Sequence, residues 1–349
     1  MRDDRALAGE RMPVREVVES AVTLLRARYV LPDRGERAAA AIEARLAAGE
    51  YDDLDETALA ERLTSQLYEV CADKHLRVLV VGPRADTAGP RADTAGPRAD
   101  TAGPREPADP ETARRARRER GRLDNFGIFR VERLDGNIGY LDLRRVADPA
   151  NAGPAIAAAM ELVSGTYALI IDLRYNGGGS PDGVIFWCSY LFQGAETHLN
   201  DIYDAESGQT RQYWSLAYVP GSRYLDRPVY VLTSAMTFSG GEELCYNLQA
   251  QGRAQLIGET TGGGAHPTEV MPITPALAIA VPFARSVNPV TGTNWEGAGV
   301  VPDLAVPAAE AHDVAYAMAL RHVLSLAAPA AIADEARAAL AWLPANGQD

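Results

Sequence analysis

The sequence predicts a layered α/β domain preceded by a small helical subdomain. Three observations support this fold class. Apolar side chains in the first seventy residues recur at helical spacing, a seven-residue repeat begins at Gly82, and short apolar strands alternate with helical stretches beyond Phe126. Alternation of this kind is typical of a sheet covered by helices, which is how such elements bury their apolar faces.

Three helices are predicted in the N-terminal region. The apolar residues from Val14 to Tyr29 fall on one helical face, and a second helical stretch covers Ala38–Leu46. A third helix is expected to begin after Asp55, whose side chain suits an N-cap, and to continue to Val70. Residues 1–80 are therefore expected to form a helical subdomain.

A repeat separates this subdomain from the rest of the chain. The motif Gly-Pro-Arg-Ala-Asp-Thr-Ala begins at Gly82, Gly89 and Gly96. Each copy carries Gly-Pro, which breaks a helix, and offers only alanine as an apolar residue. We therefore predict a flexible or extended linker that buries too little surface to offset its ordering entropy. The basic run at 114–120 is expected to be a solvated helix face, and linker and basic stretch together cover 81–125.

The remaining residues, 126–349, are expected to form the α/β core with a C-terminal helix. Strand-like, turn-rich segments follow Gly264, and the final helix is expected over 308–326. The other elements are four strands and two helices, expected at Ile138–Leu143, Ala168–Leu173, Val229–Leu232 and Gln255–Gly258, and at Ala155–Val163 and Glu242–Gln251.

Composition limits the function classes. A chain of 349 residues with 47% apolar residues can build a substantial core, and a formal net charge of -13 argues against nucleic acid or an anionic membrane as a partner. Cys71, Cys188 and Cys245 are few and widely separated, so they are expected to be small buried residues. The charged N-terminus and the absence of a long apolar run lead us to expect a cytoplasmic protein.

The strongest local signal surrounds Ser239. An apolar strand from Val229 leads through a short polar turn into a helix, and Ser239 lies where that helix begins. The first N–H groups of a helix lack intrahelical partners, so they favour an alkoxide or a nearby oxyanion. Taken alone, this serine is more simply described as an N-cap, a role that serine fills routinely.

A second signal is the glycine run at Gly177, Gly178 and Gly179, which follows the strand ending at Leu173. Glycines after a strand let the backbone approach a ligand closely and direct N–H groups at it. A dinucleotide fingerprint requires a different spacing, so an anion or oxyanion cradle is favoured over a cofactor loop. An ordinary glycine turn remains the alternative.

Four sequence blocks in this order resemble the tail-specific, or C-terminal processing, protease family. They lie at 170–179, 237–243, 258–265 and 294–303, and the resemblance extends from about Ile138 to Val306. The family resemblance implies a serine hydrolase whose core is similar to the crotonase and Clp protease folds. It also implies that Ser239 is the nucleophile.

The residue at Gly264 distinguishes the two branches of that family. The processing proteases place a catalytic lysine there, so glycine excludes a Ser-Lys dyad, and the stretch between Leu79 and Gly127 is too short for their PDZ domain. The other branch, similar to the tricorn protease core and to repeats of interphotoreceptor retinoid-binding protein, uses Ser, His and Glu. By that resemblance His75 is the base and Glu296 its acidic partner.

The remaining roles follow from this chemistry. The oxyanion is expected to bind the backbone N–H groups of Gly240 and Gly178, with Gly177 and Gly179 as neighbouring substrate contacts. His266 is the rival base or a substrate contact. Water releases the acyl group, so no metal or organic cofactor is expected. The other three histidines have no catalytic neighbours in the sequence and are expected to be structural or on the surface: His198, His312 and His322.

The substrate is predicted to be a peptide or an unfolded protein, and the sequence leaves the oligomeric state open. Two alternatives stay open. The resemblance to retinoid-binding relatives allows a binding protein for a lipophilic ligand, since a fold does not fix a function. The same triad also serves a hydrolase or cyclase acting on a small acyl compound.

Overall fold

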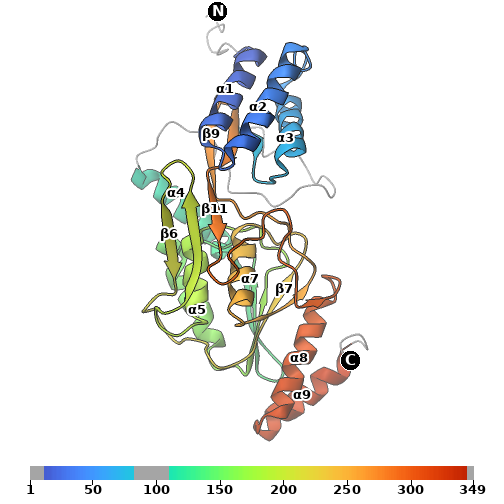
Figure 1. The fold of residues 1–349 in the computed structure, drawn as a ribbon. Coiled ribbons are helices and arrows are strands. Elements are labelled where there is room, and N and C mark those ends of the chain that lie inside the picture. The colour runs from blue at the N-terminus through green and yellow to red at the C-terminus, as the bar shows by residue number, and fades with distance from the viewer. Residues whose placement is uncertain (1–11, 82–109, 344–349) are drawn as a thin grey trace, which may run out of the picture.

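The computed structural model describes residues 12–81 and 110–343. Helices at the N-terminus lie at one end of the molecule, and the last two helices lie at the other end (Figure 1). Between them stands a layered core of sheets and helices. The predicted α/β class with an N-terminal helical region is confirmed.

The N-terminal region holds α1 (Val14–Arg28), α2 (Pro32–Ala47) and α3 (Glu56–Cys71). The Asp55 carboxylate accepts the Ala58 N–H at 2.8 Å, which is the predicted cap of α3. Helix α2 begins earlier than predicted, because a proline is tolerated in the first turn, where its missing N–H has no intrahelical partner.

Strands from the second half of the chain complete the core of this helical region. Strand β1 (Arg77–Val80) pairs antiparallel with β10 (Leu277–Pro282), which pairs in turn with β9 (Thr268–Pro272). Buried Leu277, Ile279 and Val281 pack with the apolar faces of the three helices. The segment before β1 is thereby held beside the loop before β9.

The central sheet has the strand order β12-β8-β7-β4-β3-β2, and β2 alone among its described strands runs antiparallel to its neighbour. The four strands predicted in this part of the chain are confirmed as β3, β4, β7 and β8. The bounds are β2 Ile128–Leu134, β3 Ile138–Leu143, β4 Ala168–Asp172, β7 Val229–Thr233, β8 Gln255–Gly258 and β12 Leu304–Ala305.

Helices cover both faces of this sheet. Alternate residues of each strand face opposite sides, so Leu169 and Ile171 pack in one core while Ala168 and Ile170 pack in another. The first core lies under α5 (Pro149–Val163), α6 (Pro181–Ser189) and α7 (Gly240–Ala250), and the second under α8 (Ala311–Ser325) and α9 (Ala330–Trp342). Among the described helices, none has the length and apolar content to cross a bilayer.

The remaining elements surround this core. Three strands form a separate antiparallel sheet in the order β11-β5-β6, with bounds Ala284–Val287, His198–Asp204 and Thr210–Trp214. The basic run belongs to α4 (Pro110–Leu123), followed by the short 3-10 turn η1 (Asn125–Gly127), and Arg115 and Arg118 are exposed as predicted. The repeat at 82–105 lies outside the described residues.

Three helices of the core differ from the sequence predictions. Helix α5 begins six residues earlier than predicted, at Pro149, where the Asp148 carboxylate accepts the Ala150 N–H. Helices α6 and α9 were not predicted. All three cysteines are buried and unpaired, which confirms their expected role as small core residues.

Glu243, on α7, is a buried carboxyl group in this core. Its Oε1 accepts the Asn200 Nδ2 hydrogen at 3.1 Å, and burial raises its pKa to about 7. The folded protein therefore binds this proton more tightly than the unfolded chain does. By linkage, the stabilising contribution of the protonated group is present at low pH and is lost as the pH rises through about 7.

We expect Glu243→Gln to weaken this pH dependence, because glutamine keeps the uncharged form at every pH. Between about pH 5 and pH 8, the free energy of unfolding of the variant should fall less than that of the wild type, by at most about 3 kcal/mol. Urea denaturation at a series of pH values measures both curves. Parallel curves would contradict the prediction.

Candidate active site

Ser239 lies at the junction between β7 and α7. It occupies the N-cap position of the helix with φ 52° and ψ -123°, a conformation that costs energy for a residue with a side chain. Its backbone N–H donates to Glu242 Oε2 at 2.8 Å, and its side chain is half-buried. The predicted strand, turn and helix around this serine are all present.

The glycine run lies directly beside Ser239. Strands β4 and β7 are parallel neighbours, so the loops that follow them meet at one edge of the sheet. A Cβ added at Gly178, where φ is +102°, would lie 2.7 Å from Ser239 Cβ and 3.0 Å from the Gly240 nitrogen. Only glycine allows the two loops to approach so closely.

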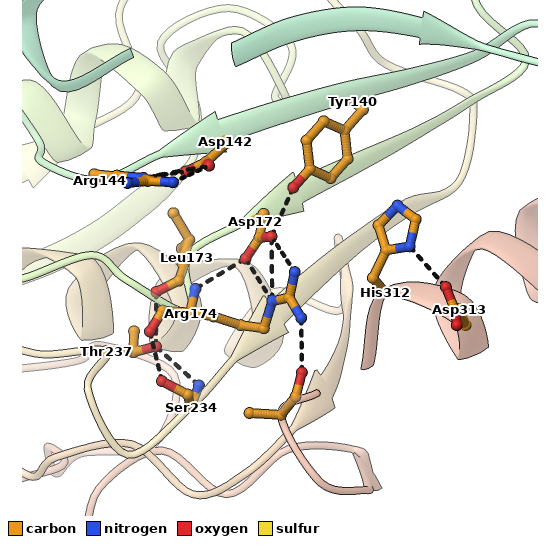
Figure 2. Close-up of polar contacts among 11 residues, drawn as sticks. Tyr140, Asp142, Arg144, Asp172, Leu173, Arg174, Ser234, Thr237, His312 and Asp313 are labelled. Atoms are coloured by element: carbon orange, nitrogen blue, oxygen red, sulfur yellow. Dashed lines mark hydrogen bonds and ion pairs between the residues drawn. The ribbon is translucent and has the colours of Figure 1, made fainter. Parts of the chain in front are cut away.

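Side chains of the turn after β7 hold the loop after β4 in place (Figure 2). Ser234 Oγ donates to the Arg174 carbonyl at 2.5 Å, and Thr237 Oγ1 donates to the Leu173 carbonyl at 2.8 Å. The Phe238 N–H adds a third link, to the Asn176 carbonyl at 2.9 Å. The turn that carries Ser239 and the glycine loop are therefore positioned as one unit.

A buried ion pair anchors the start of this loop. Arg174 donates to both carboxylate oxygens of Asp172 and to the Ala308 carbonyl at 2.7 Å, while the Tyr140 hydroxyl donates to Asp172 at 2.7 Å (Figure 2). Burial opposes ionisation of Asp172, but the hydrogen bonds and charge of Arg174 keep its pKa below the ordinary value. The end of β4 is thus tied to the segment before α8.

The backbone N–H groups beside Ser239 differ in whether they are hydrogen-bonded. The Gly178 N–H donates to Asn176 Oδ1 at 2.9 Å, so it is occupied in this structure. The Gly178 carbonyl accepts the Val146 N–H, and the Ser180 N–H donates to the Val146 carbonyl, so the N–H of Gly179 between them faces away from Val146. A Cβ added at Gly240 would lie 3.0 Å from the Gly179 nitrogen. Within the described residues, the N–H groups of Gly179 and Gly240 donate to no acceptor. In the described residues, the N–H that lies beside Gly240 without an acceptor is therefore that of Gly179, and not that of the predicted Gly178.

His75 lies between α3 and β1, and its ring packs on Phe238 with the ring centroids 4.6 Å apart. Burial lowers the pKa of His75 to about 4, so the imidazole is neutral near pH 7. Its Nδ1 is buried and has no partner among the described residues. Within those residues, no hydrogen bond joins His75 to Ser239 or to Glu296.

Glu296 and His266 belong to a buried cluster that Asp73 completes. His266 Nδ1 lies 2.8 Å from Asp73 Oδ2 and 3.6 Å from Glu296 Oε2. Asp73 Oδ1 also accepts the backbone N–H of His75 at 3.0 Å, which links the cluster to the predicted base. Glu296 accepts the Ala265 N–H at 2.6 Å, and its Oε1 is buried with no partner among the described residues.

The ionisation of the cluster follows from burial and mutual charge. Burial and the negative charge of Asp73 raise the pKa of Glu296 to about 7. Burial disfavours the charged form of His266, but its hydrogen bond to Asp73 and the charge of Glu296 outweigh that effect and raise its pKa. Burial likewise disfavours ionised Asp73, and the hydrogen bond to His266 more than compensates, so the pKa of Asp73 is lowered.

The ligand atoms of Asp73, His266 and Glu296 lie within 4.8 Å of one another, and their chemistry suits a divalent transition metal. The close hydrogen bond between His266 and Asp73 is by itself a sufficient reason for these groups to gather. We therefore assign the cluster to charge pairing.

The structure also places residues that sequence reasoning did not single out. Neither Asp73 nor Glu242 was predicted to be a site residue, and Glu242 was expected only as the start of a helix. The sequence offered one signal for each: Asp73 lies two residues before His75, and Glu242 lies three residues after Ser239. Of the other histidines, His198 pairs with Asp201 on β5, and His312 and His322 lie on α8.

Two models of one protein family match this chain. The model for peptidase family S41 matches residues 137–306, and the model for the N-terminal domain of peptidase S41 in eukaryotic IRBP matches residues 5–116. The chain is 30% identical over 181 residues to the chloroplastic carboxyl-terminal-processing peptidase 2 of Arabidopsis thaliana, which covers 49% of this chain and 32% of that protein. It is 28% identical over 189 residues to the carboxyl-terminal-processing protease of a Picosynechococcus species, covering 54% and 42%. The chain thus matches less than half the length of either relative.

Solved structures are similar in fold over a larger share of the chain. A protein of Parabacteroides merdae solved as a candidate peptidase superposes with a TM-score of 0.55 at 16% identity, covering 84% of this chain and 89% of that one. A lipoprotein from Streptococcus agalactiae gives 0.50 at 13% identity, covering 84% and 92%. At these identities the likeness concerns the fold. The two matched models describe successive parts of one architecture, in order along the sequence, and on that basis this chain belongs to peptidase family S41.

Proposed function

We propose that this protein is a serine peptidase that hydrolyses peptide bonds through an acyl-enzyme on Ser239. The observation that carries the proposal is the strained strand-turn-helix junction at Ser239, with the N–H groups of Gly179 and Gly240 beside it. Attack by Ser239 Oγ on a carbonyl creates a negative oxygen, which these two N–H groups stabilise. The intermediate then expels the amine of the cleaved peptide bond, which takes up the proton removed from Ser239, and water hydrolyses the acyl-enzyme to release the acid and restore Ser239.

His75 is the base in this proposal. It is neutral near pH 7 and therefore able to accept the Ser239 proton. Its unpartnered Nδ1 and the unpartnered Oε1 of Glu296 are a complementary donor and acceptor. Catalytic hydrogen bonds often tighten only when substrate binds, and we assign this pair to that state. Glu296 then fixes the imidazole tautomer and stabilises its protonated form.

The room at Gly264 supports His75 further. A Cβ there would lie 2.7 Å from His75 Cε1 and 2.4 Å from the Phe238 ring. The Phe238 ring and the His75 imidazole together fill the space into which a side chain at position 264 would project, which is a physical reason for glycine where the resemblance places a lysine in the processing proteases.

His266 is the competing base. In its favour, Asp73 orients Nδ1 in the manner of a catalytic Asp-His pair. Against it, a raised pKa means that a larger fraction of His266 is protonated near pH 7 and unable to accept a proton.

Labelling with a fluorophosphonate probe tests the nucleophile and the base together. We expect the wild type to label, Ser239→Ala to fail, and His75→Ala to lose labelling by about 100-fold or more, the range typical of a general base. His266→Ala should label more readily than His75→Ala. An unreactive wild type would refute the proposal and favour the binding-protein alternative, and the reverse order of the histidine variants would make His266 the base. Digestion of a peptide library then distinguishes a peptidase from a small-molecule acyl hydrolase.

Gly264→Ala tests the packing of the base. The added methyl group must displace the His75 ring or the Phe238 ring, so we expect the labelling rate to fall on the order of 100-fold, as for an ångström-scale misplacement. Gly165→Ala is the matched control, because a Cβ there meets nothing within 4 Å. Wild-type labelling in Gly264→Ala would contradict the expected displacement of the His75 ring.

A further inference from the structure

Glu242, on the first turn of α7, is fully buried with an exposed fraction of 0%. Its carboxylate accepts four hydrogen bonds. Oε2 accepts the N–H of Ser239 at 2.8 Å and of Gly264 at 2.8 Å, and Oε1 accepts the Gly263 N–H at 2.6 Å and the Thr261 hydroxyl at 2.5 Å. All the lone pairs of the group are thereby used.

A helix cap explains only one of these bonds. In a capping box, the third residue of a helix accepts the N–H of the N-cap residue, which is the bond from Ser239. The other three donors come from the segment 261–264, which is about twenty residues distant in sequence and belongs to the loop after β8. The carboxylate therefore joins the nucleophile turn to a second loop.

That second loop also binds Glu296, the candidate acidic partner of the base, by a hydrogen bond. Successive N–H groups of Gly263 and Gly264 donate to Glu242, and the next, of Ala265, donates to Glu296 Oε2 at 2.6 Å. The Gly264 carbonyl accepts the Trp295 indole N–H at 2.8 Å, and the Gly263 carbonyl accepts the Gly297 N–H at 3.0 Å. The stretch 263–265 is thus bonded to Glu242 on one side and to residues 295–297 on the other.

We propose that Glu242 is a positioning residue that fixes the main chain of Ser239 relative to Glu296 and the His75 ring. It acts through the backbone of Gly263 and Gly264 and has no contact with substrate in this role. The inference rests on the proposed function, since it assigns a role within the same site.

Substitution by glutamine tests the proposal with little change of volume. The amide nitrogen of Glu242→Gln must face either the Ser239 and Gly264 N–H groups or the Gly263 N–H and Thr261 hydroxyl. In both orientations a donor meets at least one donor, so the two loops separate. Glu243→Gln is the matched control, because it alters the adjacent buried carboxyl group, which bonds Asn200 away from these loops.

The measurement is the inactivation of each variant by the fluorophosphonate, resolved into the rate constant kinact and the probe affinity KI, together with Tm. We expect kinact of Glu242→Gln to fall on the order of 100-fold with KI nearly unchanged, because the probe still binds but meets a displaced nucleophile. Glu243→Gln should keep the wild-type kinact. Wild-type kinact in Glu242→Gln would overturn the proposal, as would equal losses in the two variants that follow their losses in Tm.

Thr261 gives a second test if Glu242→Gln does not fold. Thr261→Val removes one of the four donors and should lower kinact by less than Glu242→Gln does, whereas Thr261→Ser keeps the hydroxyl and should restore it. Equal kinact values for the valine and serine variants would overturn the proposal. A wild type that does not label would instead refute the proposed peptidase function, so the two failures are distinguishable.

Discussion

The pairing of β1 with β10 is the constraint on which the site depends. It joins Arg77 to Ala280, more than two hundred residues apart, through main-chain hydrogen bonds in the shared core of the helical region. His75 precedes β1 by two residues, and His266 precedes β9, the next strand of the same sheet, by two. This sheet is separate from the central sheet and shares its core with the N-terminal helices. It therefore brings the candidate base together with the cluster of Asp73, His266 and Glu296.

The position of Ser239, the candidate nucleophile, depends on a different constraint. Parallel neighbours β4 and β7 end at one edge of the central sheet, and the Asp172–Arg174 pair and the bonds from Ser234 and Thr237 keep their loops in contact. Close approach requires glycine at position 178. Two parts of the structure thus meet at the site: the edge of the central sheet, which carries Ser239, and the sheet of β1, β10 and β9, beside which His75 lies.

Buried carboxyl and imidazole groups are concentrated where these two parts of the structure meet. Removing carboxylates and imidazoles from water costs several kcal/mol each unless they are paired, and a shifted pKa follows from that cost. Asp73 and His266 compensate each other directly, whereas Glu296 and Glu242 depend largely on backbone N–H groups of the loop 261–265. Perturbed carboxyl groups of this kind cluster at functional sites because they supply charge at a fixed place.

Local signals were sufficient for much of the fold and for part of the site. Apolar periodicity located three N-terminal helices and four strands of the central sheet, because burial of one face dictates that spacing. The strand, turn and helix around Ser239 and the glycine run after β4 are likewise encoded by adjacent residues. Helices α6 and α9 were not predicted, because α6 is apolar on all its faces from Gly183 onward and the alanine-rich α9 shows little difference between its apolar and polar faces.

The sequence by itself determined that Ser239 stands at a helix start after a buried strand, and that position 264, where the resemblance to the processing proteases would place a lysine, is glycine. Only the tertiary structure decided that the backbone of Gly179 lies beside Gly240, that Glu296 lies against His266 and Asp73, and that Glu242 bonds the loop after β8. Local spacing specifies which face a side chain occupies within its own element. Distances between groups on different elements are set by sheet pairing and core packing across the whole chain, which no short stretch of sequence contains.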